Sequence, residues 1–256
     1  MASDIIAGAF SLIDYVRENE LLDRFVAVFQ KKHQVMVLGS SGTGKTNLLK
    51  SLRKDTLPSA VDYTNRTEFV ARHGIRILKH PFVFTDTPGQ LLHISRRREA
   101  LIEAAKGVAG ILNVVSYGYH EYKKGRGGAF DEGGRINESF LESHRHLELK
   151  ALEEWVNILG TGKTTGWLIT VVSKADLWWD RRAEVMEYYE NGAYYEALGI
   201  AKGLNPIVVE YCSVFHKFYG EGRLSGSFDD GDRNLVRFNL LRNLVEAAGG
   251  STLDER

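Results

Sequence analysis

Residues 34–46 read Gln-Val-Met-Val-Leu-Gly-Ser-Ser-Gly-Thr-Gly-Lys-Thr. The apolar run 35–38 is rich in β-branched residues, which is typical of a strand buried on both faces. Residues 47–52 follow as the first turns of an amphipathic helix. Glycines between such a strand and helix let successive backbone N–H groups point inward at phosphate oxygens. A Gly/Ser turn is the alternative, but a turn does not require Lys and then Thr at this point. The stretch therefore predicts a phosphate-binding loop.

Within this loop, the Lys45 ammonium would reach the β- and γ-phosphates, and the Thr46 hydroxyl would bind Mg²⁺. The helix N-terminus adds a partial positive charge. The residues predicted to bind nucleotide here are Gly39, Ser40, Ser41, Gly42, Thr43, Gly44, Lys45, Thr46 and Asn47.

A second motif follows the short apolar strand predicted at residues 82–85. The chain continues there as Asp86-Thr87-Pro88-Gly89-Gln90. An aspartate at the carboxyl end of a strand can reach Mg²⁺ through a water, and Gly89 can offer its backbone N–H to a γ-phosphate. An ordinary turn is the alternative, and the distance of about forty residues from the phosphate loop favours the site.

Two further polar motifs follow predicted strands. The strand at 167–172 ends in Ser173-Lys174-Ala175-Asp176, and the strand at 206–211 ends in Cys212-Ser213. Strand material is also expected at 68–71 and 74–78, around a kink at 73–74, and at 108–115. Helices are expected at 91–106, 145–160, 181–201 and 233–248, the last with one apolar side made of Leu235, Phe238, Leu241, Leu244 and Val245. This alternation predicts an α/β fold with a mostly parallel sheet and helices on both faces.

Composition restricts the classes of partner. The 256 residues are 43% hydrophobic, enough for a large core, and 33 basic side chains balance 33 acidic ones. Zero net charge gives no reason to expect nucleic acid as a partner. Cys212 is the single cysteine, which indicates a reducing compartment. No apolar run is long enough to span a membrane and no lipidation motif is present. We expect a cytoplasmic protein.

The predicted domain of residues 34–256 is flanked and interrupted by two unusual segments. Residues 1–33 show helical apolar spacing, and they either pack on their own domain or form a docking surface for a partner. Residues 116–144 are aromatic, basic and rich in glycine, and we interpret them as a mobile insertion loop.

The order of the motifs, each at the end of a predicted strand, resembles the guanine-nucleotide-binding domain of Ras-like, translation-factor-class GTPases. The resemblance covers residues 34 to about 247. It implies that Lys174 lies along the base plane and that Asp176 accepts from the N1–H and 2-amino groups of guanine, a donor pair that adenine lacks. Ser173 stands where the family most often has Asn, so we expect weaker binding or faster exchange. A solvated lysine followed by a helix cap at Asp176 is the alternative.

The resemblance implies further roles. Thr64, with Thr67 as the alternative, matches the switch threonine that joins Mg²⁺ when a γ-phosphate is present. Gln90 matches the glutamine that orients the attacking water. Cys212 and Ser213 match the loop that touches the guanine oxygen. Lys45, Thr64 and Gln90 are the catalytic candidates, and Thr46, Thr64 and Asp86 are the candidates for holding Mg²⁺.

The resulting expectation is a Mg²⁺-dependent GTPase that binds GTP and GDP and acts as a switch. A protein effector or regulator would bind through the switch loops, the N-terminal helix or the insertion. An arginine acting on the phosphates would come from Arg66 or from a partner. Two other classes remain open: an ATP-using phosphate-loop enzyme, and a GTP-bound scaffold with little hydrolysis.

Overall fold

The computed structural model describes residues 32–53, 71–77, 79–87, 108, 110–121, 128–159, 166–198, 204–220 and 226–249. The chain divides into two units, Met1–Lys32 and His33–Arg256, and every element described below lies in the second. The predicted N-terminal helix and the predicted helix at 91–106 lie outside the described residues.

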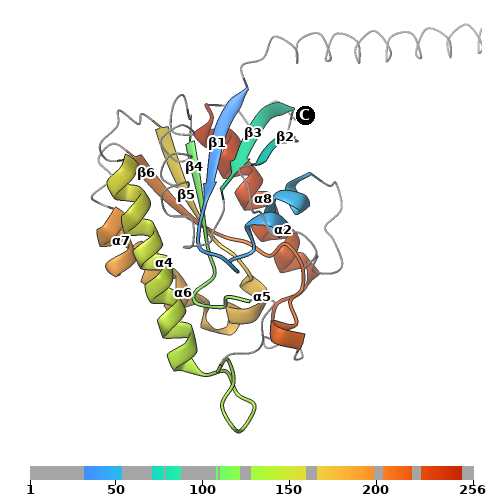
Figure 1. Cartoon of the computed structure of the whole chain (residues 1–256). Helices are drawn as coiled ribbons and strands as arrows, with labels where there is room; N and C mark the ends of the chain where they lie inside the picture. The colour runs from blue at the N-terminus through green and yellow to red at the C-terminus, as the bar shows by residue number, and fades with distance from the viewer. Residues whose placement is uncertain are drawn as a thin grey trace, which may run out of the picture. The chain divides into compact units, whose positions relative to one another are not determined.

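A six-stranded sheet forms the centre of the second unit (Figure 1). Its strands follow the order β2-β3-β1-β4-β5-β6, and every neighbouring pair is parallel except the antiparallel hairpin of β2 and β3. The mostly parallel α/β sheet predicted from the sequence is confirmed. The strand bounds are β1 His33–Leu38, β2 Ala71–Ile77, β3 His80–Asp86, β4 Gly110–Val115, β5 Gly166–Val172 and β6 Leu204–Glu210.

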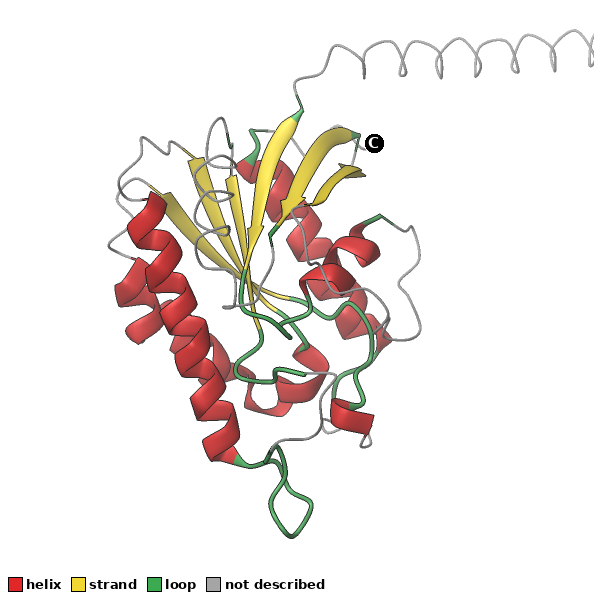
Figure 2. Cartoon of the chain, viewed as in Figure 1, coloured by secondary structure: helices red, strands yellow, loops and turns green. Residues whose placement is uncertain are grey.

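Helices cover both faces of the sheet (Figure 2). One face carries α4, α6 and α7, and the other carries α2 and α8 (Figure 1). No helix among the described residues is long and apolar enough to span a bilayer. The helices are α2 Lys45–Leu52, α4 Glu138–Leu159, α5 Ala175–Trp178, α6 Arg182–Glu190, α7 Ala193–Leu198 and α8 Asp230–Ala247, with 3₁₀ turns η2 Trp179–Arg181 and η3 Phe218–Gly220.

Alternating side chains of the strands pack into two separate hydrophobic cores, one on each face of the sheet. In β1, Met36 and Leu38 pack in the core beneath α4, whereas Val35 and Val37 pack in the core beneath α2 and α8. This alternation follows from the two-residue period of a strand. It explains why residues 35–38 read as a continuous apolar run, since both faces of the strand are buried.

Two sequence predictions about regular elements need correction. β2 runs through His73 and Gly74 without the expected kink, because both residues stay in register with Phe84 and Val83 of β3. The single helix expected at 181–201 is divided into α6 and α7 by a turn at 191–192. Tyr189 and Tyr194 of these helices are buried in the core beneath α4.

The loop predicted at 116–144 is wrong at its C-terminal end and is not exposed at its start. Residues 138–144 are the first two turns of α4, and Phe140 and Leu141 in them are buried. Residues 116–120 are also buried. Residues 122–127 lie outside the described part. The glycines and charges of this stretch suggest a loop, yet its few apolar side chains anchor it to the core.

The expected apolar side of the C-terminal helix is also wrong in part. α8 begins at the capping box formed by Asp229 and Asp232, and its buried face carries Val236, Leu240 and Leu244. Leu235 and Phe238, which were expected on the buried side, are 56% and 52% exposed.

The two faces of α8 give a matched pair of substitutions. We expect Leu240→Ala, at a fully buried position, to lower the free energy of unfolding by about 2–5 kcal/mol through lost burial and a cavity. Leu235→Ala should change it by no more than about 0.5 kcal/mol. Urea unfolding of the full chain measures both, and equal losses would contradict the observed orientation of α8.

Candidate functional site

The loop between β1 and α2 has the backbone shape that the motif predicts. Gly39 has a φ of +134°, and a Cβ on it would lie 2.2 Å from the Val114 carbonyl oxygen of β4. Only glycine fits there, because the loop passes directly against the neighbouring strand. Gly44, with a φ of +94°, is the N-cap residue of α2. The loop therefore curls over the carboxyl end of the sheet and turns into a helix N-terminus.

Lys45 folds back over this loop. Its Nζ donates to the Gly39 and Ser40 carbonyl oxygens at 2.8 and 2.7 Å, and the residue is 8% exposed. The Thr43 hydroxyl donates to the same Ser40 oxygen at 3.0 Å. A buried ammonium held above a curled loop at a helix start is a site for an anion. Contact of Lys45 with the β- and γ-phosphates stays a prediction.

The strand register brings the second motif to the phosphate loop. Asp86, the last residue of β3, pairs in register with Val37 of β1, and Thr87 donates to the Val37 carbonyl oxygen from its backbone N at 3.3 Å and from its hydroxyl at 2.8 Å. Asp86 is 1% exposed. Gly89, Gln90, Thr64 and Thr67 lie outside the described residues.

The donor set of this end of the sheet fits Mg²⁺. The Thr46 hydroxyl belongs to the first turn of α2, and the Asp86 carboxylate ends the strand beside β1. Both are hard oxygen ligands, which Mg²⁺ prefers, and their number leaves positions for water and phosphate oxygens.

Ser173 joins the third motif to the phosphate loop. Its hydroxyl lies 2.6 Å from the Thr43 carbonyl oxygen and 2.8 Å from the Val115 carbonyl oxygen, and its backbone N donates to Val115 at 2.8 Å. A serine side chain can donate only one hydrogen bond, so we expect that Ser173 cannot contact both the base and the phosphate loop. One hydroxyl proton serves the two protein carbonyls, so this side chain holds the loops together.

Lys174 and Asp176 follow at the same end of β5. Lys174 has a φ of 60°, an uncommon conformation for a residue with a side chain, and it is the N-cap residue of α5. Its Nζ donates to the Tyr119 carbonyl oxygen at 2.6 Å and pairs with Glu121 Oε2 at 3.1 Å. The alternative interpretation, in which the Lys174 side chain is exposed to solvent, is excluded because the residue is only 3% exposed.

Asp176 is fully buried, and its partners come from the segment after β6. The Cys212 thiol lies 3.3 Å from Asp176 Oδ1, the His216 backbone N lies 2.5 Å from Oδ2, and His216 Nδ1 lies 2.9 Å from Oδ1. Burial would raise the pKa of this carboxyl, but the charge and hydrogen bonds of His216 outweigh it and hold the pKa below its ordinary value. Burial and the nearby carboxylate raise the pKa of the Cys212 thiol, which therefore acts as a donor.

Cys212 and Ser213 lie where the sequence predicts them, directly after β6. Ser213 is 6% exposed, and its carbonyl oxygen accepts from Arg233 Nη2 of α8 at 2.7 Å. In the phosphate loop, Ser40, Ser41 and Asn47 are partly exposed. Every described member of the predicted nucleotide site thus lies at the carboxyl end of the sheet.

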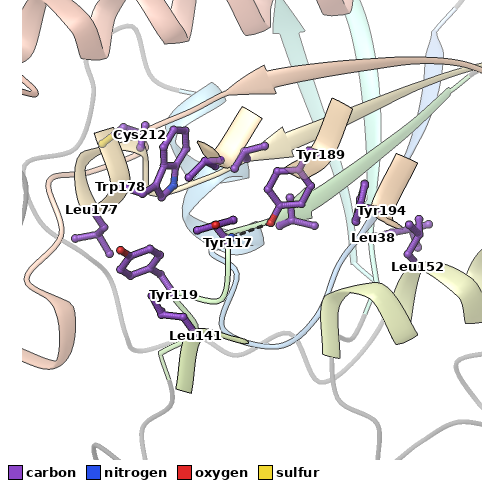
Figure 3. Close-up of a cluster of buried hydrophobic side chains, with 14 of the residues drawn as sticks. Leu38, Tyr117, Tyr119, Leu141, Leu152, Leu177, Trp178, Tyr189, Tyr194 and Cys212 are labelled. Atoms are coloured by element: carbon purple, nitrogen blue, oxygen red, sulfur yellow. Dashed lines mark hydrogen bonds between the residues drawn. The ribbon is translucent and has the colours of Figure 1, made fainter. Parts of the chain in front are cut away.

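The segment 116–121 is the part of the site that sequence reasoning missed. It is held by Glu148 of α4, which is buried and whose Oε1 accepts from the backbone N of Ser116 at 2.8 Å and contacts His120 Nε2 at 2.8 Å. The Tyr189 hydroxyl donates to Glu148 Oε2 at 2.7 Å and accepts from the backbone N of Tyr117 at 2.9 Å, the contact drawn in Figure 3. This network fixes the loop beside the nucleotide site.

Glu121 of this segment lies against the phosphate loop. Its backbone N lies 3.5 Å from the Gly42 carbonyl oxygen, and a Cβ on Gly42 would lie 2.9 Å from the Glu121 carbonyl oxygen. The signal available in the sequence is a charged residue among aromatics directly after a strand, a pattern that an exposed loop shares.

Comparison with known proteins agrees with this arrangement. Residues 34–146 match the model of a family described as 50S ribosome-binding GTPase. The match supports a P-loop GTPase domain and confirms the resemblance inferred from the motifs. The match supports binding of guanine nucleotide and GTP hydrolysis in general terms. A search of curated proteins gives no match to the chain.

The buried His120 makes stability depend on pH. Burial lowers its pKa below 6.5, against the opposing effect of Glu148, so the unfolded chain takes up a proton below pH 6.5 that the folded chain does not. We expect the free energy of unfolding to fall by up to about 1.4 kcal/mol per pH unit as pH decreases from 6.5. Urea unfolding should show a smaller decrease for His120→Gln and an unchanged one for His146→Gln, an exposed histidine of α4. Identical pH dependence in all three proteins would contradict this assignment.

Proposed function

We propose that this chain is a Mg²⁺-dependent GTPase that acts as a nucleotide switch. One observation carries the proposal: the Ser173 hydroxyl lies 2.6 Å from the Thr43 carbonyl oxygen, so the loop predicted to read the base adjoins the loop predicted to hold the phosphates. A single guanine nucleotide can then contact both. A carboxylate that accepts from two donors on the guanine edge rejects adenine strongly, because the mismatch leaves polar groups unpaired.

Each residue of the site has a role that phosphoryl transfer requires. Lys45 and the loop amides hold the phosphates, and Thr46 and Asp86 would hold Mg²⁺, the second through a water. Mg²⁺ supplies neutralisation of the charge that develops on the phosphate oxygens. From the sequence, Gln90 would orient the attacking water and Thr64 would sense the γ-phosphate. Positioning and charge stabilisation supply most of the acceleration in such sites.

The switch role rests on segments outside the described residues. Residues 55–67 and 88–98 are the sequence candidates for segments that respond to the γ-phosphate. A protein effector, a regulator that supplies an arginine, and a cytoplasmic location likewise stay predictions. The two other classes, a GTP-bound scaffold and an ATP-using enzyme, make different predictions for the two experiments that follow.

Asp176→Asn tests base recognition. The amide can accept from guanine at one atom only, and its NH₂ group opposes the 2-amino group, whereas it can donate to the 2-carbonyl of xanthine. We expect the Kd for GTP to rise by about 100-fold and the variant to prefer xanthosine triphosphate to GTP. Binding of fluorescent nucleotides to the full chain with Mg²⁺ measures this. Equal binding of ATP and GTP by the unaltered chain would favour the ATP-using enzyme instead.

Gln90→Leu tests hydrolysis separately from binding. The attacking water loses the group that orients it, so we expect the single-turnover rate of phosphate release to fall at least about tenfold. The Kd for GTP should stay within about twofold, because the leucine removes no binding contact assigned to the base or phosphates. A scaffold would release no phosphate in either protein while still binding GTP.

A further inference from the structure

Both residues assigned to base recognition already have partners from the chain itself. Lys174 Nζ binds the Tyr119 carbonyl oxygen and the Glu121 carboxylate. The Asp176 carboxylate binds the Cys212 thiol and His216, and the residue is 0% exposed. A guanine edge could not reach these oxygens without movement of the protein. The described form of the base site, meaning Lys174 and Asp176, is therefore closed.

His216 presents the same kind of donor pair as guanine. Its backbone N–H lies at one oxygen of Asp176 and its ring Nδ1 lies at the other, at 2.5 and 2.9 Å. An ionised carboxylate only accepts, so Nδ1 carries the proton. Guanine offers N1–H and a 2-amino N–H to the same two oxygens. One histidine thus satisfies the carboxylate in the way that the base would.

A second contact ties this histidine's segment to the loop after β4. Glu121 Oε1 accepts from the Tyr219 backbone N at 2.9 Å while its Oε2 pairs with Lys174. The Tyr219 hydroxyl donates to the His120 carbonyl oxygen at 3.1 Å. Burial would raise the pKa of Glu121, but the charge and hydrogen bond of Lys174, the Tyr219 backbone N–H and the nearby His216 together outweigh burial and hold the pKa below its ordinary value. Glu121 therefore bridges the base-reading lysine and the segment that covers the aspartate.

Backbone strain gathers at the same place. Four described residues other than glycine have a positive φ, and three of them are Tyr117, Lys174 and Tyr219, at 52°, 60° and 50°. One comes from each of the three loops that meet at the base site. Such conformations persist only where surrounding contacts impose them, and they are common in segments that change conformation.

The same side chains could instead form a metal site. Asp176, Cys212 and His216 place their ligand atoms within 4.8 Å of one another. Tetrahedral coordination by Zn²⁺ would hold an oxygen and a nitrogen ligand about 3.3 Å apart. The observed 2.9 Å between Oδ1 and Nδ1, and the backbone N–H on the other oxygen, favour direct hydrogen bonds.

We propose that His216 is a plug that occupies the base site in the nucleotide-free chain, and that Glu121, which holds both Lys174 and the Tyr219 backbone, is its latch. Guanine nucleotide binds only after the plug withdraws from Asp176 and Glu121 releases Lys174. The proposal rests on the proposed function, because it assigns Lys174 and Asp176 to the base. It adds a competitor within the chain that slows nucleotide association.

The closed state can be tested without nucleotide. Amide hydrogen exchange of the full, nucleotide-free chain, read by mass spectrometry over residues 214–220, should show protection in the unaltered protein. Glu121→Ala removes the latch, and we expect exchange there to become about tenfold faster. Glu142→Ala, at an exposed glutamate of α4, is the control and should leave it unchanged. Absence of protection in the unaltered chain would overturn the proposal.

Nucleotide association tests the competition. Stopped-flow binding of a fluorescent GDP analogue should be about tenfold faster for Glu121→Ala and for His216→Ala than for the unaltered chain. Unchanged or slower association in both variants would overturn the plug while leaving the proposed function intact. If none of these proteins binds guanine nucleotide, the proposed function is wrong. The proposed competition between His216 and guanine is then wrong as well, even if hydrogen exchange shows that residues 214–220 are protected.

A zinc-binding assay tests whether Asp176, Cys212 and His216 form a metal site instead. The proposal expects the chain to hold no stoichiometric Zn²⁺ after purification and none after incubation with equimolar Zn²⁺ and dialysis. Stoichiometric Zn²⁺ that is lost in Cys212→Ser and in His216→Ala would overturn the plug in favour of a metal site.

Discussion

The carboxylate of Glu148 is the interaction on which the nucleotide end of this molecule depends. It lies fully buried in α4, and hydrogen bonds from Ser116, His120 and Tyr189 hold the loop that leaves β4. These hydrogen bonds, with the neighbouring His120, outweigh the effect of burial and keep its pKa below the ordinary value. A buried charge is tolerated only with such a set of partners. Because the loop is held here, its residue Glu121 reaches both Gly42 and Lys174.

Much of the fold and the outline of the site follow from the sequence. Apolar runs in the sequence indicate buried strands, and in a parallel sheet the carboxyl ends of the strands lie at one edge. That is why Thr43, Asp86 and Ser173, far apart in the chain, can be assigned to one site from the order of the motifs alone. The register of Val37 with Asp86 and the contact of Ser173 with Thr43 agree with that assignment.

The rest could not be read from the sequence, because it depends on tertiary contacts that leave no local pattern. His216 and Asp176 are separated by 40 residues, and His120 and Glu148 by 28. The start of α4 escapes prediction because glycines and charges outnumber the apolar anchors Phe140 and Leu141 before residue 145. In α8, apolar residues occur on two sides, so periodicity alone could not decide which side faces the core. Local composition is a weak guide wherever a few long-range contacts determine the packing.

Ser173 and the plug both affect the free energy of guanine nucleotide binding. In the structure the Ser173 hydroxyl is used between two protein carbonyl groups, so the base would be held chiefly by Lys174 and Asp176. Those two residues are the ones that Glu121 and His216 occupy. When a binding-competent state is only partly populated, the apparent affinity falls by that fraction, so a plug closed about 99% of the time weakens binding about 100-fold. A site with few base contacts leaves the closed state able to compete, and the exchange of nucleotide would then be governed by how readily Glu121 releases Lys174.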